Sequence, residues 1–372
     1  MRTDTRSLSL ASIDVRGFRN LASVRLELGA GFNVFSGDNG QGKTNVLEAV
    51  YVLATSKSFR AAKPGDLVRH GGDVASVRGV FVEQGEERNQ SVGLRPGARM
   101  AKIEDKKPKT LAAYAVRTPI VVFHPQVMSL SMAGGSERRR LLDRISLYRS
   151  PASLEALENY DRASKARQKA LETRGVAARD LDEWEALVVE HGTRVLASRR
   201  EATELVARAA TLAYERIGAP GRALGVSYVA GAPESPDAYR EALVARRPAD
   251  LRRGSATVGP HRDDVELRIG DVPVRGVASQ GQHRAVVLAL KLAEIEVVRS
   301  ARGVQPVLLL DDVSSELDRE RTSALFAFLR DHEGQVLLTT TRPELIDTGD
   351  RSLGPARRNF AVERGEVRDL RG

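Results

Sequence analysis

The sequence predicts an α/β fold in which one α/β lobe is built from two separated halves of the chain, with a mainly helical lobe inserted between them. Three observations predict it: a phosphate-loop motif at residues 37–44, a buried-strand pattern ending in two carboxylates at 311 and 312, and helical periodicity over much of the stretch between them. We therefore expect residues 1–130 to form the N-terminal half of the α/β lobe, residues 131–254 the helical lobe, and residues 255–372 the C-terminal half.

The phosphate loop is the most specific motif in the chain. Residues 37–44 fit G-x-x-x-x-G-K-[ST], with an apolar strand pattern at 31–36 before it and a helical pattern at 45–53 after it. Glycines let the backbone N–H groups point at phosphate oxygens, and a helix N-terminus favours anions. We expect Lys43 to reach the β- and γ-phosphates and Thr44 to hold Mg²⁺. The predicted nucleotide-binding residues are Gly37, Asp38, Asn39, Gly40, Gln41, Gly42, Lys43 and Thr44.

Flanking segments predict the rest of the two lobes. Alternating apolar residues at 8–15 and 24–28 predict strands ahead of the loop, and residues 74–123 predict short strands with a hairpin tip near 83–89. Apolar runs at 118–123, 304–310 and 335–341 are typical of buried strands. Between them, helical spacing and helix-start signals predict a helical lobe over roughly residues 130–250.

A second half of the site is predicted where the apolar strand at 307–310 runs into Asp311 and Asp312. Magnesium chemistry beside a phosphate loop requires an acid at such a strand end. We expect Asp311 to bind Mg²⁺, directly or through water, and Asp312 to orient and polarise the attacking water. The alternative is an Asp pair that caps a following helix. The phosphate loop elsewhere in the chain favours the metal-site interpretation.

Residues 278–282 form a short polar loop that precedes a clear helical pattern at 284–294. Ser279, Gly281 and the helix N-terminus make a second anion-binding feature. A serine in this position is usually only a helix cap. Its place upstream of the acidic strand favours a functional interpretation.

Composition limits the classes of function. The chain has 58 Lys and Arg against 49 Asp and Glu, a formal charge of +9, and no cysteine. Disulfides, thiolate chemistry and Cys-based zinc sites are therefore excluded. No apolar run reaches the roughly 20 residues that span a bilayer, and the N-terminus has no signal-peptide pattern, so we expect a cytoplasmic location. The basic balance is compatible with a polyanionic partner, although a solvated basic surface explains it on its own.

The order of these motifs resembles that of the ABC-type ATPases: phosphate loop, a signature loop at 279–282, the acidic strand, and a segment at 314–318 similar to their D-loop. Within that superfamily the chain resembles the RecF family of bacterial DNA replication and repair proteins over nearly its whole length. The blocks that carry this resemblance are residues 17–21, 37–48, 58–60, 137–143, 259–264, 279–284 and 309–318.

The resemblance implies an ABC-type ATPase head that binds ATP and Mg²⁺. It implies an ATP-dependent homodimer in which each nucleotide lies between the phosphate loop of one protomer and the signature loop of the other. It implies that Lys43, Thr44, Asp311 and Asp312 bind the nucleotide of their own protomer, in cis, with Lys43 and Asp312 as catalytic residues. It implies that the nucleotide of the other protomer is bound in trans by the signature loop, residues Ser279, Gln280, Gly281 and Gln282. Slow hydrolysis would release a dimer bound to DNA, and RecR and RecO would be partners in loading RecA at single-strand gaps.

Several residues depart from the ABC pattern. Gln280 replaces the first Gly of the common S-G-G-Q signature, and most ABC ATPases have Glu where this chain has Asp312. The usual switch His is missing, and Thr340 or Thr341 falls near its place. These departures predict slow turnover, and the resemblance implies a weak, DNA-dependent ATPase.

Two other functions remain as alternatives. A nucleotide subunit of a membrane transporter would need a coupling partner and normally has a smaller helical insert. An SMC-like structural ATPase would need sustained heptads over hundreds of residues, whereas only about 120 residues separate the two halves here.

Other polar residues are left with two interpretations each. Gln126 could sense the nucleotide or lie on the surface. His261 and Arg262, in the block at 259–264, could lie near the nucleotide or the dimer seam, or belong to a polar turn. Arginine clusters at 138–140, 199–200, 246–247 and 252–253 could contact DNA phosphates or form solvated helix faces. Because aromatic residues are only 5% of the chain, backbone-directed duplex binding is favoured over base stacking.

Overall fold

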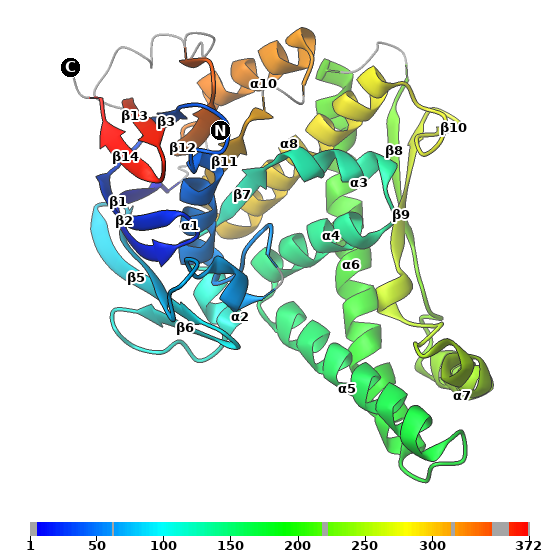
Figure 1. The fold of residues 1–372 in the computed structure, drawn as a ribbon. Helices are drawn as coiled ribbons and strands as arrows, with labels where there is room; N and C mark the ends of the chain where they lie inside the picture. Colours follow the sequence, from blue (N-terminus) through cyan, green and yellow to red (C-terminus); the bar gives the residue numbers. More distant parts are fainter. Residues whose placement is uncertain (1–5, 62, 218–221, 314–316, 344–356, 371–372) are drawn as a thin grey trace. The chain divides into compact units, whose positions relative to one another are not determined.

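The computed structural model describes residues 6–61, 63–217, 222–313, 317–343 and 357–370 (Figure 1). The chain divides into two compact units. The first contains Met1–Val127 and Val298–Gly372, and the second contains Met128–Val297. The α/β class, with the chain returning to its first unit after a largely helical segment, agrees with the expectation from the sequence.

A six-stranded, largely parallel sheet forms one layer of the first unit. Among the described strands its order is β14-β13-β3-β12-β11-β7, in which β13 and β14 pair antiparallel and the other neighbours pair parallel. The strands are β3 (Phe32–Ser36), β7 (Ile120–Phe123), β11 (Val307–Asp311), β12 (Val336–Thr340), β13 (Arg358–Glu363) and β14 (Glu366–Asp369). The central strands are buried on both faces, as parallel strands usually are. This explains their unbroken apolar runs in the sequence.

An antiparallel sheet forms the other layer, in the order β2-β1-β4-β5-β6. Its strands are β1 (Leu8–Phe18), β2 (Leu21–Glu27), β4 (Ala75–Glu83), β5 (Glu86–Arg95) and β6 (Ala98–Ile103). Alternate residues of these strands are buried, which places one face of the sheet in the core and leaves the other outward. The β4–β5 turn lies inside the predicted hairpin tip.

Helix α1 (Lys43–Thr55) packs against strands of both sheets, so its apolar residues belong to a core cluster shared by the two layers. A helix enclosed in this way needs apolar residues around most of its circumference. Other described elements of this unit are η1 (Pro64–Leu67), α2 (Leu111–Ala115) and α10 (Arg319–Asp331), and η2 (Pro125–Met128) ends on the first residue of the second unit. Helix α8 (Gln280–Arg302) belongs to the second unit up to residue 297 and to the first unit from residue 298 on.

The second unit is built mainly from helices. They are α3 (Ser129–Met132), α4 (Ser136–Arg149), α5 (Ala152–Arg174), α6 (Leu181–Ile217) and α7 (Pro236–Arg253), followed by η3 (Pro260–Arg262). A small sheet accompanies them, in the order β10-β9-β8, from β8 (Leu224–Val229), β9 (Asp264–Ile269) and β10 (Val272–Pro273). Because β9 pairs with β8, residues after 254 also lie in this unit. The boundary expected at 254/255 therefore falls inside it, and the division of the chain by function remains a prediction.

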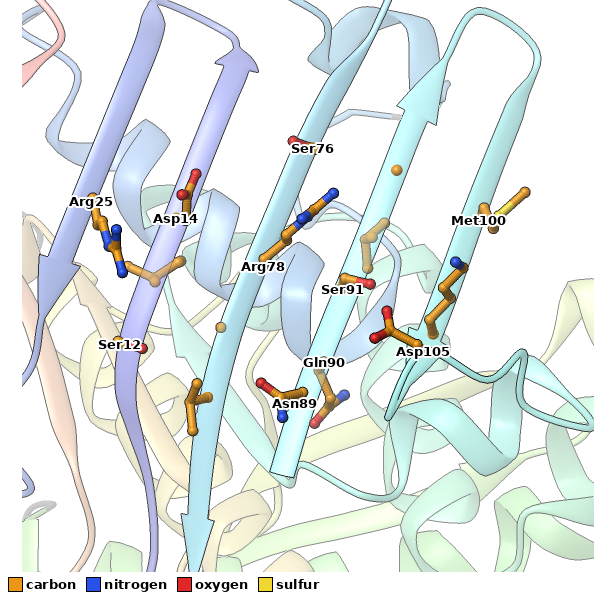
Figure 2. Close-up of a pocket in the computed structure, with 16 residues that line it drawn as sticks. Ser12, Asp14, Arg25, Ser76, Arg78, Asn89, Gln90, Ser91, Met100 and Asp105 are labelled. Atoms are coloured by element: carbon orange, nitrogen blue, oxygen red, sulfur yellow. The ribbon is translucent and has the colours of Figure 1, made fainter. Parts of the chain in front are cut away.

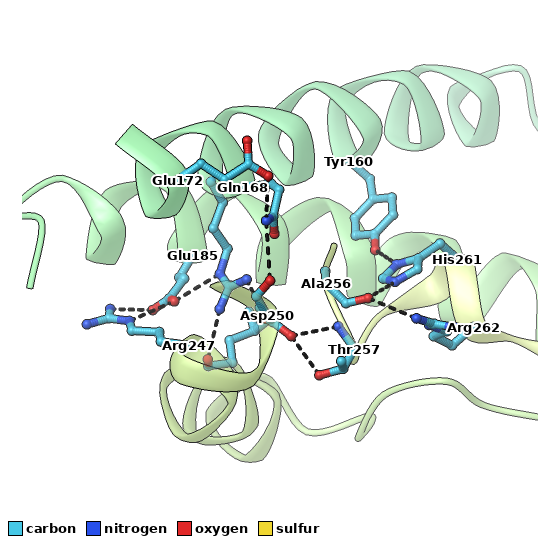
Figure 3. Close-up of polar contacts among 12 residues, drawn as sticks. Tyr160, Gln168, Glu172, Glu185, Arg247, Asp250, Ala256, Thr257, His261 and Arg262 are labelled. Carbon is cyan, nitrogen blue, oxygen red and sulfur yellow. Dashed lines mark hydrogen bonds and ion pairs between the residues drawn. The ribbon is translucent and has the colours of Figure 1, made fainter. Parts of the chain in front are cut away.

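Buried ion pairs join the helices of the second unit (Figure 3). Arg167 on α5, with 1% of its surface exposed, donates to Glu185 of α6 at 3.0 Å and to Asp250 of α7 at 2.7 Å. Asp250 also accepts from the backbone N–H and the hydroxyl of Thr257, at 2.8 and 2.7 Å. Removing one partner of such a group would leave a charge buried without compensation. Within the described residues, no helix is long and apolar enough to cross a membrane.

Candidate nucleotide site

The phosphate loop joins β3 to α1, as the motif predicts. Gly37, Gly40 and Gly42 have φ values of 151°, 80° and 116°, a region that side-chain-bearing residues rarely adopt. A Cβ atom on Gly37 would also lie 2.3 Å from the carbonyl oxygen of Val362. The tip of the loop, residues 38–40, is exposed. The glycines therefore allow both the curl of the loop and its close contact with β13.

Lys43 is the first residue of α1, and its side chain folds back over the loop. Its ammonium donates to the carbonyl oxygens of Gly37 and Asp38, at 2.6 and 2.8 Å. Only 7% of Lys43 is exposed, and burial lowers the pKa of its ammonium, while Asp312, Asp311 and Asp38 oppose that shift. The cation is thus held inside the loop and within the electrostatic influence of the predicted acidic pair.

Thr44 and Asp311 meet at the ends of their elements. The Thr44 hydroxyl donates to Oδ1 of Asp311 at 2.8 Å, and the Thr339 hydroxyl donates to the same oxygen at 2.8 Å. Strand β12 lies between β3 and β11, so Thr339 of β12 pairs with Asp311 on one side and Phe35 on the other. Burial raises the pKa of the Asp311 carboxyl, which is 4% exposed. A hydroxyl and a carboxylate at this distance are an oxygen set suited to Mg²⁺.

Asp312 follows β11 in a left-handed backbone conformation, with φ of 48°. Its backbone N–H donates to the Thr339 hydroxyl at 2.9 Å. Its charge raises the pKa of both Lys43 and Asp311, although burial is the main influence on each. Thr339 therefore orients both acidic residues, through the carboxylate of one and the amide of the other.

Thr339 was not predicted from the sequence. The prediction placed Thr340 or Thr341 near the missing switch His, and Thr340 is buried at 1% exposure with its hydroxyl accepting from Arg342 N–H. The detectable signal was the run of three threonines at the end of an apolar strand. Which of the three faces Asp311 depends on strand register, which the sequence alone does not fix.

Two short motifs of the N-terminal half are tied to α1 through Glu48, which is fully buried. Arg19 donates to both carboxylate oxygens of Glu48, at 3.0 Å each, and the Ser58 hydroxyl donates at 2.5 Å. Arg60 lies 3.6 Å from Glu48 and donates to Asn45 at 3.0 Å. The residue blocks at 17–21 and 58–60 therefore brace the helix that begins in the phosphate loop. Arg60 also lowers the pKa of Asp311, against the larger effect of burial.

The signature loop lies in the second unit, at the start of α8. Ser279 and Gln282 form a reciprocal capping box: Ser279 N–H donates to Gln282 Oε1 at 2.8 Å, and Gln282 N–H donates to the Ser279 hydroxyl at 3.3 Å. Ser279 and Gln280 are exposed, and a Cβ on Gly281 would meet no atom within 4 Å. Ser279 therefore does cap the helix, and the N-terminus of α8 is still open to solvent.

Helix α8 is anchored by a buried ion cluster. Glu294, 1% exposed, accepts from Arg144 of α4 at 2.7 Å and pairs with Lys291 one turn earlier. Burial would raise the pKa of Glu294, but Arg144 and Lys291 outweigh it and hold that pKa at about 2. Burial lowers the pKa of Lys291 to about 8. These charges fix the signature helix against α4.

Two other predicted features are only partly visible. Residues 314–316 of the expected D-loop lie outside the described residues, while Asp318 caps α10 by accepting from Arg321 N–H at 3.0 Å. Gln126 is an exposed residue of η2 and has a polar or electrostatic contact of its own.

The block at 259–264 forms a polar turn at η3. His261 bonds through Nδ1 with the Tyr160 hydroxyl at 2.6 Å and through Nε2 with the Ala256 carbonyl at 2.8 Å (Figure 3). Burial lowers the pKa of His261. Asp263 is fully buried and accepts from Arg199 at 2.8 Å, from the Tyr228 hydroxyl at 2.6 Å and from Gly231 N–H at 2.8 Å. The block joins several elements of the second unit, as the polar-turn interpretation requires.

Interpreting the arginine cluster at 138–140 as a DNA contact is wrong for Arg138. Its guanidinium is 4% exposed and makes two bonds to Asp264, at 2.7 and 3.0 Å. Arg139 donates to the Asp263 carbonyl at 2.7 Å, and Arg140 pairs with Glu137 on the surface. Arg199 is likewise buried between Asp143 and Asp263. These cations hold the block at 259–264, because burying a guanidinium requires a bonded carboxylate.

Known proteins resemble this chain along its whole length. The family model described as RecF/RecN/SMC N terminal domain matches residues 9–362. A protein of Anaeromyxobacter sp. (strain Fw109-5) described as DNA replication and repair protein RecF is 40% identical over 98% of this chain and 100% of its own length. A protein of the same description from Myxococcus xanthus is 39% identical over 91% of this chain and 92% of its own.

Solved structures agree. One described as the recombination mediator protein RecF-ATP in the RecFOR pathway covers 100% of both chains, with a TM-score of 0.86 and 30% identity. A head domain of Smc from Pyrococcus furiosus covers 98% of this chain and 96% of its own, with a TM-score of 0.52 and 16% identity, which shows the fold alone. The expected ABC-type ATPase head fold is confirmed by these matches. On the family model and the full-length identity together, this chain belongs to the RecF family of DNA replication and repair proteins.

Proposed function

We propose that this protein binds ATP with Mg²⁺ in the loop at residues 37–44. The observation that carries the proposal is the convergence of the Thr44 and Thr339 hydroxyls on one oxygen of Asp311, beside the buried ammonium of Lys43. Lys43 would exchange its bonds to the loop carbonyls for bonds to the β- and γ-phosphates. Thr44 and Asp311 would hold the metal, which when bound neutralises charge on the phosphate oxygens. The RecF–ATP structure of a relative supports this assignment.

Asp312 would orient and polarise the water that attacks the γ-phosphate. Its backbone is already fixed by the Thr339 hydroxyl, so its carboxylate starts from a defined position. Asp is one methylene shorter than the Glu of most ABC ATPases, and Thr340 or Thr341 would stand near the place of the missing switch His. We expect slow, DNA-dependent turnover that times the release of a bound state.

The signature loop would complete the site of a second protomer. Ser279, Gly281 and the open N-terminus of α8 present donors suited to a γ-phosphate. Each nucleotide would then contact two subunits, so ATP would stabilise a homodimer by mass action. Gln280 and Gln282 would line the same surface, with Gln282 fixing Ser279.

DNA would bind through its phosphate backbone. Figure 2 shows the outward face of the antiparallel sheet, where Arg25, Asp14, Arg78 and Ser91 lie on successive strands. These residues line a hollow of about 420 Å³. Strand register continues that row to Lys102. Asp14 is bound to Arg16, whereas the side chains of Arg25, Arg78 and Lys102 make no ion pair or hydrogen bond with the described part of the chain. With strands about 4.8 Å apart, these three cations are spaced by about 10 Å.

The lining of that hollow suits a sugar-phosphate chain rather than bases. It includes the small residues Ser12, Ser76, Ser91 and Gly93, and no aromatic side chain. Small side chains permit close approach of a backbone, and the absence of aromatics removes the usual platform for stacking. We therefore propose sequence-tolerant DNA binding, with RecR and RecO as partners and RecA loading at single-strand gaps as the outcome. The RecFOR description of the structural relatives supports the pathway. A cytoplasmic location remains a prediction.

The mass of the protein in solution tests the switch. Analytical ultracentrifugation should find monomers without nucleotide and dimers with Mg²⁺ and a slowly hydrolysed ATP analogue, with duplex DNA strengthening dimerisation. Ser279→Arg should still bind ATP but remain monomeric, because the added side chain blocks the signature surface. Single subunits at saturating nucleotide and DNA would contradict the proposal.

Salt dependence tests the DNA surface. The variant with Arg25→Gln, Arg78→Gln and Lys102→Gln should lower the slope of log K against log salt by about 2 to 3, at about 0.9 for each phosphate that the protein no longer neutralises. A control with Arg208→Gln, Arg216→Gln and Arg240→Gln changes the net charge equally at exposed positions of α6 and α7. Equal slopes for the two variants would reject the sheet face as the DNA surface.

A further inference from the structure

The last hairpin of the chain touches the phosphate loop through its backbone. Strands β13 and β14 are joined by a two-residue turn, Arg364 and Gly365, with φ values of 51° and 83°. The N–H of Arg364 donates to Oε1 of Gln41 at 2.7 Å, and the N–H of Gly365 donates to the Gln41 carbonyl at 2.8 Å. One turn thus holds both the side chain and the backbone of a single residue in the middle of the loop.

Close packing accompanies these bonds. The Gln41 carbonyl also accepts from Asn20 Nδ2 at 3.1 Å. A Cβ on Gly365 would lie 2.3 Å from the Asn20 carbonyl oxygen, and a Cβ on Gly42 would lie 2.8 Å from the Asn20 side-chain amide. Gly365 is buried although it lies in a turn. The turn, Asn20 and the loop therefore meet with no room for a further methyl group.

The first glycine of the loop rests on the same hairpin. Gly37 lies against the carbonyl of Val362 in β13, and β13 pairs with β3 up to Ser36. The loop is consequently supported by this hairpin at its start and at its centre. A glycine-rich segment has wide conformational freedom, so its N–H groups converge on a phosphate only if something outside the loop fixes them.

We propose that the turn at Arg364 and Gly365 is a positioning element of the nucleotide site, which holds the phosphate loop in its binding shape. The inference rests on the proposed function, because it takes the ligand of the loop to be a nucleoside triphosphate. Because coupling between two sites is reciprocal, a nucleotide bound in the loop stabilises the turn by the same free energy that the turn contributes to binding.

The chain contains a matched control. The β4–β5 turn, Gln84 and Gly85, has φ values of 54° and 85°, and its flanking residues Glu83 and Glu86 pair as do Glu363 and Glu366. Gln84 N–H is also bonded, to the Ser7 carbonyl at 3.2 Å. A Cβ on Gly85, however, would meet no atom within 4 Å. The two turns share their backbone strain and differ in their contact with the phosphate loop.

Hydrogen exchange of the unmodified full chain tests the coupling without a mutation. At an ATP analogue concentration 100 times its Kd, exchange at Arg364 and Gly365 should slow by up to about 100-fold, while Gln84 and Gly85 stay unchanged. Nucleotide binding without protection of Arg364 and Gly365 would overturn the inference and leave the proposed function standing. Absence of nucleotide binding would overturn the proposed function itself.

Alanine substitutions provide the second measurement. Gly365→Ala should raise the Kd for the ATP analogue about tenfold or more, from loss of the bonds to Gln41. Gly85→Ala imposes the same left-handed strain and should leave that Kd within about twofold of the unmodified protein. Equal Kd values for the two variants would show that the turn acts only on the stability of its own hairpin.

Discussion

The phosphate loop and the block at residues 259–264 both begin with a glycine and are rich in polar side chains, but the structure uses their polar groups in opposite ways. In the loop, residues 38–40 are exposed, and the Lys43 ammonium donates to carbonyls of the loop itself. In the block, Asp263 is fully buried and accepts from Arg199, Tyr228 and Gly231. The first region leaves hydrogen-bonding capacity facing outward, whereas the second consumes it internally.

This difference distinguishes a binding site from a structural junction, whereas the residue types alone do not. A His, an Arg and two Asp side chains in six residues have the chemistry of an active site, yet each carboxylate of the block already has a bonded cation from another element. A buried charge that is fully paired contributes to one specific fold, while an open cluster of donors is suited to a ligand. Four substitutions sharpen or break this distinction.

Asp263→Ala should have the largest effect, and on stability rather than on nucleotide affinity. It leaves one Nη1 bond of Arg199, the Tyr228 hydroxyl and the Gly231 N–H without their carboxylate acceptor, while Asp143 still pairs with Arg199. The combined loss should be about 3–5 kcal/mol of unfolding free energy. Urea denaturation measures the loss, with Asp271→Ala as an exposed control on the same unit. A change below about 1 kcal/mol would show that the block is not a structural junction.

Lys43→Ala should have the opposite effects, a large loss of nucleotide affinity and almost no loss of stability. It removes charge-assisted bonds to the phosphates, worth about 1.5–3 kcal/mol each, and so weakens ATP binding by about 100-fold or more. The midpoint of unfolding without nucleotide should stay close to that of the unmodified protein. Titration with a fluorescent ATP analogue checks the affinity, and Lys109→Ala serves as an exposed lysine control. Unchanged affinity would remove the loop from the proposed site.

Asp312→Asn separates hydrolysis from binding. Loss of the carboxylate should slow single-turnover hydrolysis by about 100-fold, within the usual range for general-base removal, while ATP affinity changes little. The nucleotide-bound dimer should persist longer as a result. A rate typical of fast transport ATPases in the unmodified protein, or an unaltered rate in the variant, would contradict the role of Asp312.

Tyr228→Phe should have the smallest effect of the four. It removes one hydrogen bond to the Asp263 carboxylate but leaves the bonds from Arg199 and Gly231, so the expected loss is about 1–2 kcal/mol of stability. Denaturant unfolding measures it against the larger loss in Asp263→Ala. A loss as large as that of Asp263→Ala would mean that the bonds around Asp263 fail together rather than singly.

Much of the fold was predictable because the signals were local. The phosphate loop needs glycines at fixed spacing between a strand and a helix, and Gly37, Gly40 and Gly42 adopt the positive φ values that explain them. Buried parallel strands need unbroken apolar runs, which is why residues 307–310 and 335–341 were recognised. Asp311 lies at the end of β11, as expected for the same reason, and that strand is flanked by β12 and β7.

What the sequence could not predict depended on pairing between distant segments. Nothing in the local sequence distinguishes Arg138 from an arginine on the protein surface. It is buried because the fold brings Asp264, 126 residues later in the chain, to pair with its guanidinium. Thr339 rather than Thr341 faces Asp311 because of strand register. The support of Gln41 by Gly365 joins residues 324 positions apart through backbone atoms, which leave no trace in side-chain patterns.

By itself, then, the sequence determined the chemistry available to this protein: a loop able to receive phosphates, an acidic strand end, and a chain whose family membership extends from end to end. Tertiary structure alone decided which of its many charges are paired with one another and which still face outward. The physical reason is that periodicity and glycine spacing act over a few residues, whereas satisfying a buried charge requires a partner brought by the fold from anywhere in the chain.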